Sequence, residues 1–345
     1  MKVRKFVAFL TLPIAMLGGC GGGENTRDSI RAVGSSTVLP FAKIVAQDFA
    51  RSNPNFSSPI IESTGTGAGF ALFCSGIGPH TPDVANASRQ IKATEFADCQ
   101  QNGVTEIVEI QVGLDGIAFA SAKNGITMNL TPEIVYRALA ARPYGQQQTA
   151  KNWSDIDPSL PKQRILVYGP PATSGTRDAL KELVLKVGCD ANPAMKALKS
   201  SNPEEHEKVC TEVRNDGAFV EQGEQDNLIV QKIESNPQAV GVFGFSYLEE
   251  NLDRLQDLPM NGVLATYDNI ASFKYLGARP LYIYVKKAHL DAIPGLREFV
   301  GTWAKSWGRE GPLAKAGLVA SPDDVAAQNT RRASEFTTLS ASEVG

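Results

Sequence analysis

Three short segments of the chain are rich in glycine, serine and threonine and stand where an expected strand gives way to an expected helix. They are residues 34–37 (Gly-Ser-Ser-Thr), 65–69 (Gly-Thr-Gly-Ala-Gly) and 173–177 (Thr-Ser-Gly-Thr-Arg). The first backbone N–H groups of a helix have no partner within the helix, and the helix dipole makes this end positive. Glycine lets a ligand approach the backbone closely, and hydroxyl groups add donors. This composition is therefore typical of a site that binds a small anion.

Each of these turns also has an ordinary explanation, because serine and threonine are common helix caps. Three such turns in one chain, spread over both halves, favour a shared anion site over three unrelated caps. Residues 65–69 do not match the G-x-G-x-x-G dinucleotide fingerprint, and the chain has no P-loop Gly-Lys-Ser or Gly-Lys-Thr. Neither nucleotide-binding motif is therefore present.

A fourth segment, residues 87–91, follows an expected strand and offers the Ser88 hydroxyl and the Arg89 guanidinium. Arginine can donate two parallel hydrogen bonds to the oxygens of a phosphate group, which makes Arg89 a candidate anion ligand. The alternative is a surface arginine paired with a carboxylate.

Strand-like and helix-like stretches alternate along the chain, as hydrophobic periodicity indicates. Thr131 and Pro132 form an N-cap and first turn that open one of the helices. This alternation predicts an α/β sheet architecture, and two such lobes joined by extended segments would leave a cleft between them, where the strand ends bind ligands. The expected strands lie at 29–33, 59–63, 84–87, 107–120, 164–168, 240–247 and 281–285, and the expected helices at 40–49, from 70 onward, 131–140, 176–185 and 296–307.

The length of 345 residues favours two domains. Apolar residues make up 42% and charged residues 21% of the chain, which is typical of a soluble globular protein and argues against a disordered tail protein and against a polytopic membrane protein. The net charge of −3 provides no excess of cations for the phosphate backbone of a nucleic acid, so we expect no nucleic-acid partner.

The N-terminus reads as an export signal. Three cations (Lys2, Arg4 and Lys5) precede an apolar run of 12 residues at 6–17. A membrane-spanning helix needs about 20 residues, so this run is too short to span and is excluded from the fold. Removing the three cations leaves 31 cations against 37 anions, a net charge near −6.

The run ends in Leu-Gly-Gly-Cys at residues 17–20, which resembles the bacterial lipoprotein signal, whose cysteine is lipidated after cleavage. We therefore expect a signal peptide at 1–19, lipidation of Cys20 and a flexible, glycine-rich tether at 20–28. The protein would then lie in the periplasm or cell envelope, anchored by lipid alone. The alternative is plain secretion without lipidation.

The other four cysteines permit three disulfide pairings. An oxidising compartment allows disulfides to form, and we favour the local pairing of Cys74 with Cys99 and of Cys189 with Cys210. The alternative is a metal site, but the chain has no Cys-x-x-Cys and three histidines in all.

Five motifs occur along the chain in the order found in one known family. Through them the chain resembles the solute-binding proteins of the bacterial phosphate-specific ABC transporter, which are type II periplasmic binding proteins, over nearly its whole mature length. The motifs are residues 32–41 (Ala-Val-Gly-Ser-Ser-Thr-Val-Leu-Pro-Phe), 83–91 (Asp-Val-Ala-Asn-Ala-Ser-Arg-Gln-Ile), 173–177, 240–247 (Val-Gly-Val-Phe-Gly-Phe-Ser-Tyr) and 279–287 (Arg-Pro-Leu-Tyr-Ile-Tyr-Val-Lys-Lys).

The resemblance implies a two-lobed α/β fold with the ligand cleft between lobes joined by two crossover segments. Lobe 1 would comprise residues 29–113 and 278–345, and lobe 2 residues 114–277. The implied function is capture of inorganic phosphate and its delivery to an ABC permease, by a monomer with no enzyme activity, no cofactor and no metal.

The resemblance also implies the ligand contacts. Two departures from the family stand out: Ser88 occupies a position where some members have an aspartate that accepts the proton of phosphate, and Pro170 one where some have an arginine. Arg89 or Arg177 could supply the cation instead, and Asp115 is a candidate proton acceptor, with a solvated or capping aspartate as the alternative. The implied contacts are Ser36, Thr37, the backbone of Val38, Thr66, Ser174, Gly175 and Thr176.

Other functions stay open. The Ser88 departure allows another oxyanion such as sulfate, molybdate or a phosphonate as the ligand. A phosphate-ester hydrolase is less favoured, because the sequence has no H-E-x-x-H, no G-x-S-x-G and no dense cluster of Asp and His. A sensor or surface protein with a vestigial pocket is a third alternative.

Overall fold

The structure, a computed structural model, describes residues 27–172, 174–223 and 227–344. The expected signal peptide at 1–19, the lipidation site Cys20 and most of the expected tether lie outside the described residues. Within these ranges, no helix combines the length and the apolar character needed to cross a membrane.

The strands form one continuous path through two lobes. In lobe 1, β1 pairs in parallel with β2 and β3, whereas β9 runs antiparallel to β3 and β4. In lobe 2, β4 pairs with β7, and β5 lies parallel to β6 and β7. The order is β2 (Ile60–Ser63), β1 (Arg31–Gly34), β3 (Val84–Ala87), β9 (Ala278–Lys286), β4 (Ile107–Ala122), β7 (Val240–Gly244), β5 (Val167–Gly169) and β6 (Phe219–Glu221), with β8 (Leu255–Asp257) paired to β4.

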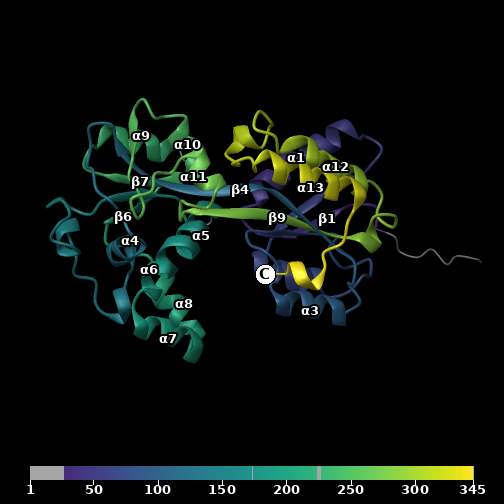
Figure 1. The fold of residues 1–345 in the computed structure, drawn as a ribbon, viewed down its shortest axis with the longest axis horizontal. Coiled ribbons are helices and arrows are strands. Elements are labelled where there is room, and N and C mark those ends of the chain that lie inside the picture. Colours follow the sequence, from purple (N-terminus) through teal and green to yellow (C-terminus); the bar gives the residue numbers. More distant parts are fainter. Residues whose placement is uncertain (1–26, 173, 224–226, 345) are drawn as a thin grey trace, which may run out of the picture.

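The helices cover the sheet in two groups, one on each lobe (Figure 1). Lobe 1 carries α1 (Leu39–Ser52), α2 (Thr66–Phe73), α3 (Ala93–Gln101), α12 (Leu296–Ser306) and α13 (Asp323–Glu335). Lobe 2 carries α4 (Pro132–Leu139), α5 (Gly175–Ala179), α6 (Lys186–Asp190), α7 (Pro193–Ser201), α8 (Pro203–Thr211), α9 (Asn227–Ser235), α10 (Phe245–Glu249) and α11 (Tyr267–Ala271), and a π-helix at Leu180–Leu185 joins α5 to α6.

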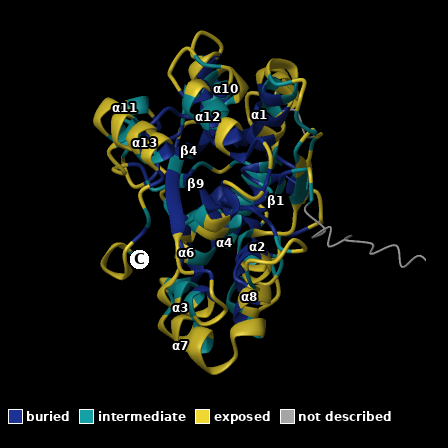
Figure 2. Ribbon diagram, turned by 90° about the vertical axis from the view of Figure 1, so that its right-hand side faces the viewer, coloured by how far each residue is buried: buried dark blue, intermediate teal, exposed yellow. Residues whose placement is uncertain are grey.

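Both faces of the lobe 1 sheet are covered, and the alternation of side chains along β9 shows how. Leu281 and Ile283 lie in the core beneath α1 and α12, whereas Tyr282 and Tyr284 lie in the core beneath α2 and α3. A third core, in lobe 2, gathers around β5 and β7. The strand β4 passes from one lobe to the other (Figure 1) and is buried along nearly its whole length (Figure 2). Together β4 and β9 are the extended segments that connect the lobes.

The structure changes several element boundaries expected from the sequence. The strand expected at 240–247 ends at Gly244, because Phe245 and Leu248, three residues apart, both turn into the core of lobe 2 as the first turn of α10. The expected strand at 164–168 begins at Val167 and the helix expected from residue 70 begins at Thr66. The helix expected at 176–185 divides into α5 and the π-helix.

Both disulfides have the local pairing that the sequence favoured. Cys74 is joined to Cys99, which ties α2 to α3, and Cys189 is joined to Cys210, which ties α6 to α8. His206 lies beside the second disulfide and shares a hydrogen bond of 2.7 Å with Asp190. Because both sulfurs are committed to the disulfide, this group offers no thiolate ligand to a metal.

Removing the second disulfide should lower the stability of the protein substantially. The bond closes a loop with a sequence separation of 21, so the double variant C189A/C210A should lose about 3 kcal/mol of unfolding free energy on the chain-entropy model. Alanine is chosen because both positions are fully buried. Urea denaturation measures the loss. An unchanged midpoint in the variant would contradict the stabilising role.

Candidate ligand-binding site

The first predicted turn lies between β1 and α1. Its backbone is held by the Ser35 N–H, which donates to the carbonyl of Asn86 over 2.9 Å, and by the Thr37 N–H, which donates to the Ser35 hydroxyl. The N-cap of α1 is Val38, whose side chain cannot cap, so the first N–H groups of the helix have no side-chain partner. The Leu39 N–H donates to the Ser35 carbonyl over 3.1 Å, and Pro40 has no N–H. The start of α1 therefore offers an anion at most the N–H groups of Val38 and Phe41.

The second turn brings α2 directly against the end of β1. A Cβ placed on Gly69 would lie 2.6 Å from the Cα of Gly34, so only glycine permits this approach. Thr66 then starts α2, and its hydroxyl lies 3.1 Å from the hydroxyl of Ser88 at the end of β3. The structure thus pairs two predicted ligand residues, Thr66 and Ser88, that are 22 positions apart in the sequence.

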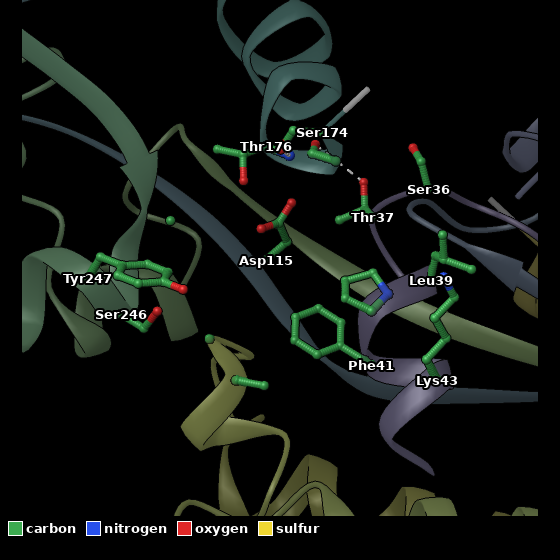
Figure 3. Close-up of a pocket in the computed structure, with 15 residues that line it drawn as sticks. Ser36, Thr37, Leu39, Phe41, Lys43, Asp115, Ser174, Thr176, Ser246 and Tyr247 are labelled. Atoms are coloured by element: carbon green, nitrogen blue, oxygen red, sulfur yellow. Dashed lines mark hydrogen bonds between the residues drawn. The ribbon is translucent and has the colours of Figure 1, made fainter. Parts of the chain in front are cut away.

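The third turn, from lobe 2, meets the first. A Cβ on Gly175 would lie 2.5 Å from the Cα of Thr37, and the Thr37 hydroxyl is 3.4 Å from the carbonyl oxygen of Gly175. The Ser36 hydroxyl donates to the carboxylate of Asp178 over 2.6 Å. The starts of α1 and α5 are therefore in contact across the two lobes (Figure 3).

A cavity of about 530 Å³ opens beside this contact. Asp115 projects into it from β4, between the first and third turns (Figure 3). Thr66 and Ser88 are not part of its lining. The lining residues are Ser36, Thr37, Leu39, Pro40, Phe41, Lys43, Asp115, Ser174, Gly175, Thr176, Gly244, Ser246, Tyr247, Ala316 and Gly317.

Asp115 is paired with an arginine that the sequence did not single out. The Nε–H of Arg279 on β9 donates to the Asp115 carboxylate over 3.1 Å, because the two residues face each other in the register of β4 and β9. Burial raises the pKa of Asp115, and the Arg279 guanidinium opposes this rise only in part. Asp115 therefore takes up a proton more readily than an exposed aspartate does.

Arg279 makes further contacts with both lobes. Its Nη2–H donates to the Thr37 hydroxyl over 2.8 Å and lies 3.5 Å from the carbonyl oxygen of Gly175. Its Nη1–H donates to the carboxylate of Glu182 on the π-helix. Only 5% of the Arg279 side chain is exposed. The guanidinium thus lies directly behind the contact between the first and third turns.

The two arginines predicted as cations lie elsewhere. Arg89 forms two hydrogen bonds, of 2.8 and 2.7 Å, to the carboxylate of Glu95. Arg177 is buried, donates to the Pro170 carbonyl over 3.0 Å and stacks over the ring of Phe219. Burial lowers the pKa of Arg177. Neither Arg89 nor Arg177 is therefore among the residues that line the cavity. Their contact with the ligand stays a prediction.

Comparison with known proteins assigns the chain to a family. The PBP superfamily domain matches residues 21–304. The chain belongs to the PBP superfamily. The phosphate-binding protein PstS of Staphylococcus saprophyticus is 28% identical over 334 residues, which cover 93% of this chain and 91% of PstS. The protein SphX of Synechococcus elongatus is 31% identical over 292 residues, which cover 82% of this chain and 75% of SphX.

Two solved structures share the fold. The crystal structure of a possible phosphate binding protein from Planctomyces limnophilus superimposes with a TM-score of 0.71 at 25% identity, covering 89% of this chain and 98% of that one. An ABC-type phosphate transport receptor from Vibrio cholerae superimposes with a TM-score of 0.57 at 21% identity, covering 85% and 99% of the two chains. The two-lobed α/β fold expected from the sequence is thereby confirmed.

Two charged residues behind the cavity, Arg279 and Glu182, do not line it and were not predicted as site residues from the sequence. Arg279 stands at the start of a recognised motif, but nothing in the motif distinguishes it from an exposed arginine on a strand. What places Arg279 at the site is the pairing of β4 with β9, which sets it opposite Asp115, 164 positions away in the sequence. Glu182 lies within a helix expected from the sequence and carries no local signal at all.

Proposed function

We propose that this protein is an extracytoplasmic solute-binding protein that captures inorganic phosphate and delivers it to an ABC permease. The observation that carries the proposal is the meeting of two helix starts, from different lobes, beside the cavity that contains Asp115. The relatives named phosphate-binding proteins give the ligand its identity. No bond is made or broken in this role, so the protein is not an enzyme.

The ligand is bound by local donors. With a net charge near −6 for the exported chain, the overall field of the protein repels an anion, so affinity must come from nearby N–H and hydroxyl groups. Thr66 and Ser88 lie in the same lobe as Thr37 but outside the cavity lining, so their contact with the ligand rests on the family resemblance. Hinge rotation about β4 and β9 would open and close the contact between the two lobes, as in periplasmic binding proteins. The proposed donors are Thr37, the backbone of Val38, Thr66, Ser88, Ser174, Gly175 and Thr176. Ser36 would join them only by giving up its hydrogen bond to Asp178.

Asp115 gives the site its selectivity. Hydrogen phosphate carries a proton that it can donate to a carboxylate, whereas sulfate is fully ionised and has none. A buried carboxylate in the cavity therefore accepts a hydrogen bond from phosphate and repels sulfate. Asp115 thus accepts the phosphate proton in place of the aspartate that some members of the family have at the position of Ser88.

The protein works outside the cytoplasm as a monomer. Its export signal at 1–19 would be removed, and a lipid on Cys20 would hold it at the membrane through the tether at 20–28. This arrangement keeps the two lobes free to close on the ligand and to dock on a permease.

Calorimetric titration of ligand-stripped protein with phosphate and with sulfate tests this function. We expect phosphate to bind far more tightly than sulfate at neutral pH and to raise the melting temperature, because a ligand that binds only the folded state stabilises it. Equal affinity for the two anions would contradict phosphate selectivity. Failure to bind any oxyanion would favour a sensor or surface protein instead.

A further inference from the structure

We propose that Arg279 is the cation that neutralises the bound anion, and that Glu182 competes with the anion for it. This inference rests on the proposed function and names the residues that regulate affinity at the same site. In this chain Pro170 stands where some members of the family have an arginine, and Arg279 supplies the positive charge instead. Its guanidinium contacts Thr37 and Gly175, which belong to the two turns that meet at the cavity.

The contact with Thr37 places Arg279 within one hydrogen bond of the ligand. The Thr37 hydroxyl accepts a hydrogen bond from the guanidinium over 2.8 Å, and its own proton is donated to the Gly175 carbonyl over a long 3.4 Å, so a closer anion oxygen can take that proton. A hydroxyl polarised in this way is a stronger donor to an anion. Arg279 therefore acts on the ligand both by its charge and through Thr37.

Glu182 holds the opposite edge of the same guanidinium. Its carboxylate accepts from Nη1 of Arg279, yet 47% of its side chain is exposed, compared with 5% for Arg279. A half-exposed carboxylate can move away from its partner at little cost, whereas the buried arginine cannot leave. The negative charge of Glu182 on Nη1 therefore offsets part of the Arg279 charge that an anion on the Nη2 and Thr37 side would feel, and this carboxylate can move away when the anion enters.

Asp115 differs from Glu182 in this respect. Its side chain is 14% exposed and sits on β4, directly opposite Arg279 in the strand register. Asp115 therefore stays with Arg279 and fixes the orientation of the guanidinium, while Glu182 is the partner that is exchanged.

The charge-neutral variant E182Q provides the test, and E221Q is its matched control. Glu221 is 48% exposed, lies in lobe 2 and pairs with Arg177 at 3.4 Å, so E221Q makes the same change of net charge away from Arg279. We expect E182Q to bind phosphate roughly 3- to 10-fold more tightly than wild type, as removal of a half-exposed competing charge allows. E221Q should bind with wild-type affinity.

The conservative variant R279K completes the experiment. Lysine keeps the charge but loses the planar set of donors, so R279K should bind phosphate about 10-fold more weakly, and adding E182Q to it should no longer raise affinity. An equal gain in E182Q and E221Q, a loss in E182Q, or unchanged binding in R279K would each overturn the inference. Wild-type titration tests the proposed function separately, because the inference depends only on ratios between variants and wild type.

Lys43 provides a second check, because it lines the same cavity from α1. If K43A abolished binding while R279K left it unchanged, the cation would be Lys43 and the inference would be overturned. We expect the reverse, with the larger loss in R279K, because Lys43 is exposed and solvent screens its charge.

Discussion

Replacing Gly175 with alanine should abolish tight phosphate binding and leave the fold intact. A Cβ at this position would lie 2.5 Å from the Cα and 3.0 Å from the N of Thr37, and both are backbone atoms that cannot rotate aside. The two lobes would have to separate to accommodate it. At least two hydrogen bonds to the charged ligand, each worth about 1.5–3 kcal/mol, would then be lost, so we expect affinity to fall at least about 100-fold.

Calorimetric titration measures this loss, and thermal denaturation shows that the protein is folded. Alanine favours a helix over glycine by about 1 kcal/mol, so the start of α5 should not be weakened. The control is G301A in α12, where a Cβ would meet nothing within 4 Å and which lies away from the cavity. Phosphate affinity within a few-fold of wild type in G175A would contradict the close approach of the two turns.

The parts of the fold that rest on periodicity could be predicted. The run at 107–120 and the run at 281–285 are so strongly apolar and β-branched that both were expected as strands, and they became β4 and β9. Boundaries were less predictable, because they depend on which core a side chain finally enters. Phe245 shows this, since its contacts in the core of lobe 2 turn a strand-like sequence into α10.

The candidate site likewise has parts that the local sequence predicts and parts that only the tertiary structure determines. The turns at 34–37, 65–69 and 173–177 carry their signal locally, in glycine and hydroxyl residues. The partners of the arginines carry no such signal. Arg89 meets Glu95 because Glu95 caps the start of α3, and Arg279 meets Asp115 because two long strands pair in one register. Which arginine faces the ligand is therefore a property of tertiary structure.

Asp115→Asn should remove the discrimination between phosphate and sulfate. The amide is nearly the same size, but its NH₂ group donates where the carboxylate accepts, so the proton of hydrogen phosphate loses its acceptor. A hydrogen bond to a charged group is worth about 1.5–3 kcal/mol, so phosphate affinity should fall roughly 10- to 100-fold. Sulfate affinity should rise, because the negative charge that repelled it is gone. Parallel titrations with the two anions measure the ratio.

The matched control is Asp257→Asn in lobe 2. Asp257 is another aspartate whose pKa is raised by burial, to about 6, and it accepts from the Ala265 N–H rather than from a residue of the cavity. D257N removes the same kind of titrating group and should keep the wild-type ratio of phosphate to sulfate affinity. A ratio that falls equally in D115N and D257N would contradict a specific role for Asp115.

The pH dependence of sulfate binding reports the protonation of Asp115, because the charge of sulfate itself does not change between neutral and mildly acidic pH. Burial raises the pKa of Asp115 above the ordinary value for aspartate, so its carboxylate takes up a proton earlier as the pH falls. The protonated group no longer repels sulfate and can donate to it. Sulfate affinity should therefore rise on acidification in the wild type and stay flat in D115N. The same pH profile in both proteins would assign the titration to another group and leave Asp115 as a partner of Arg279 only.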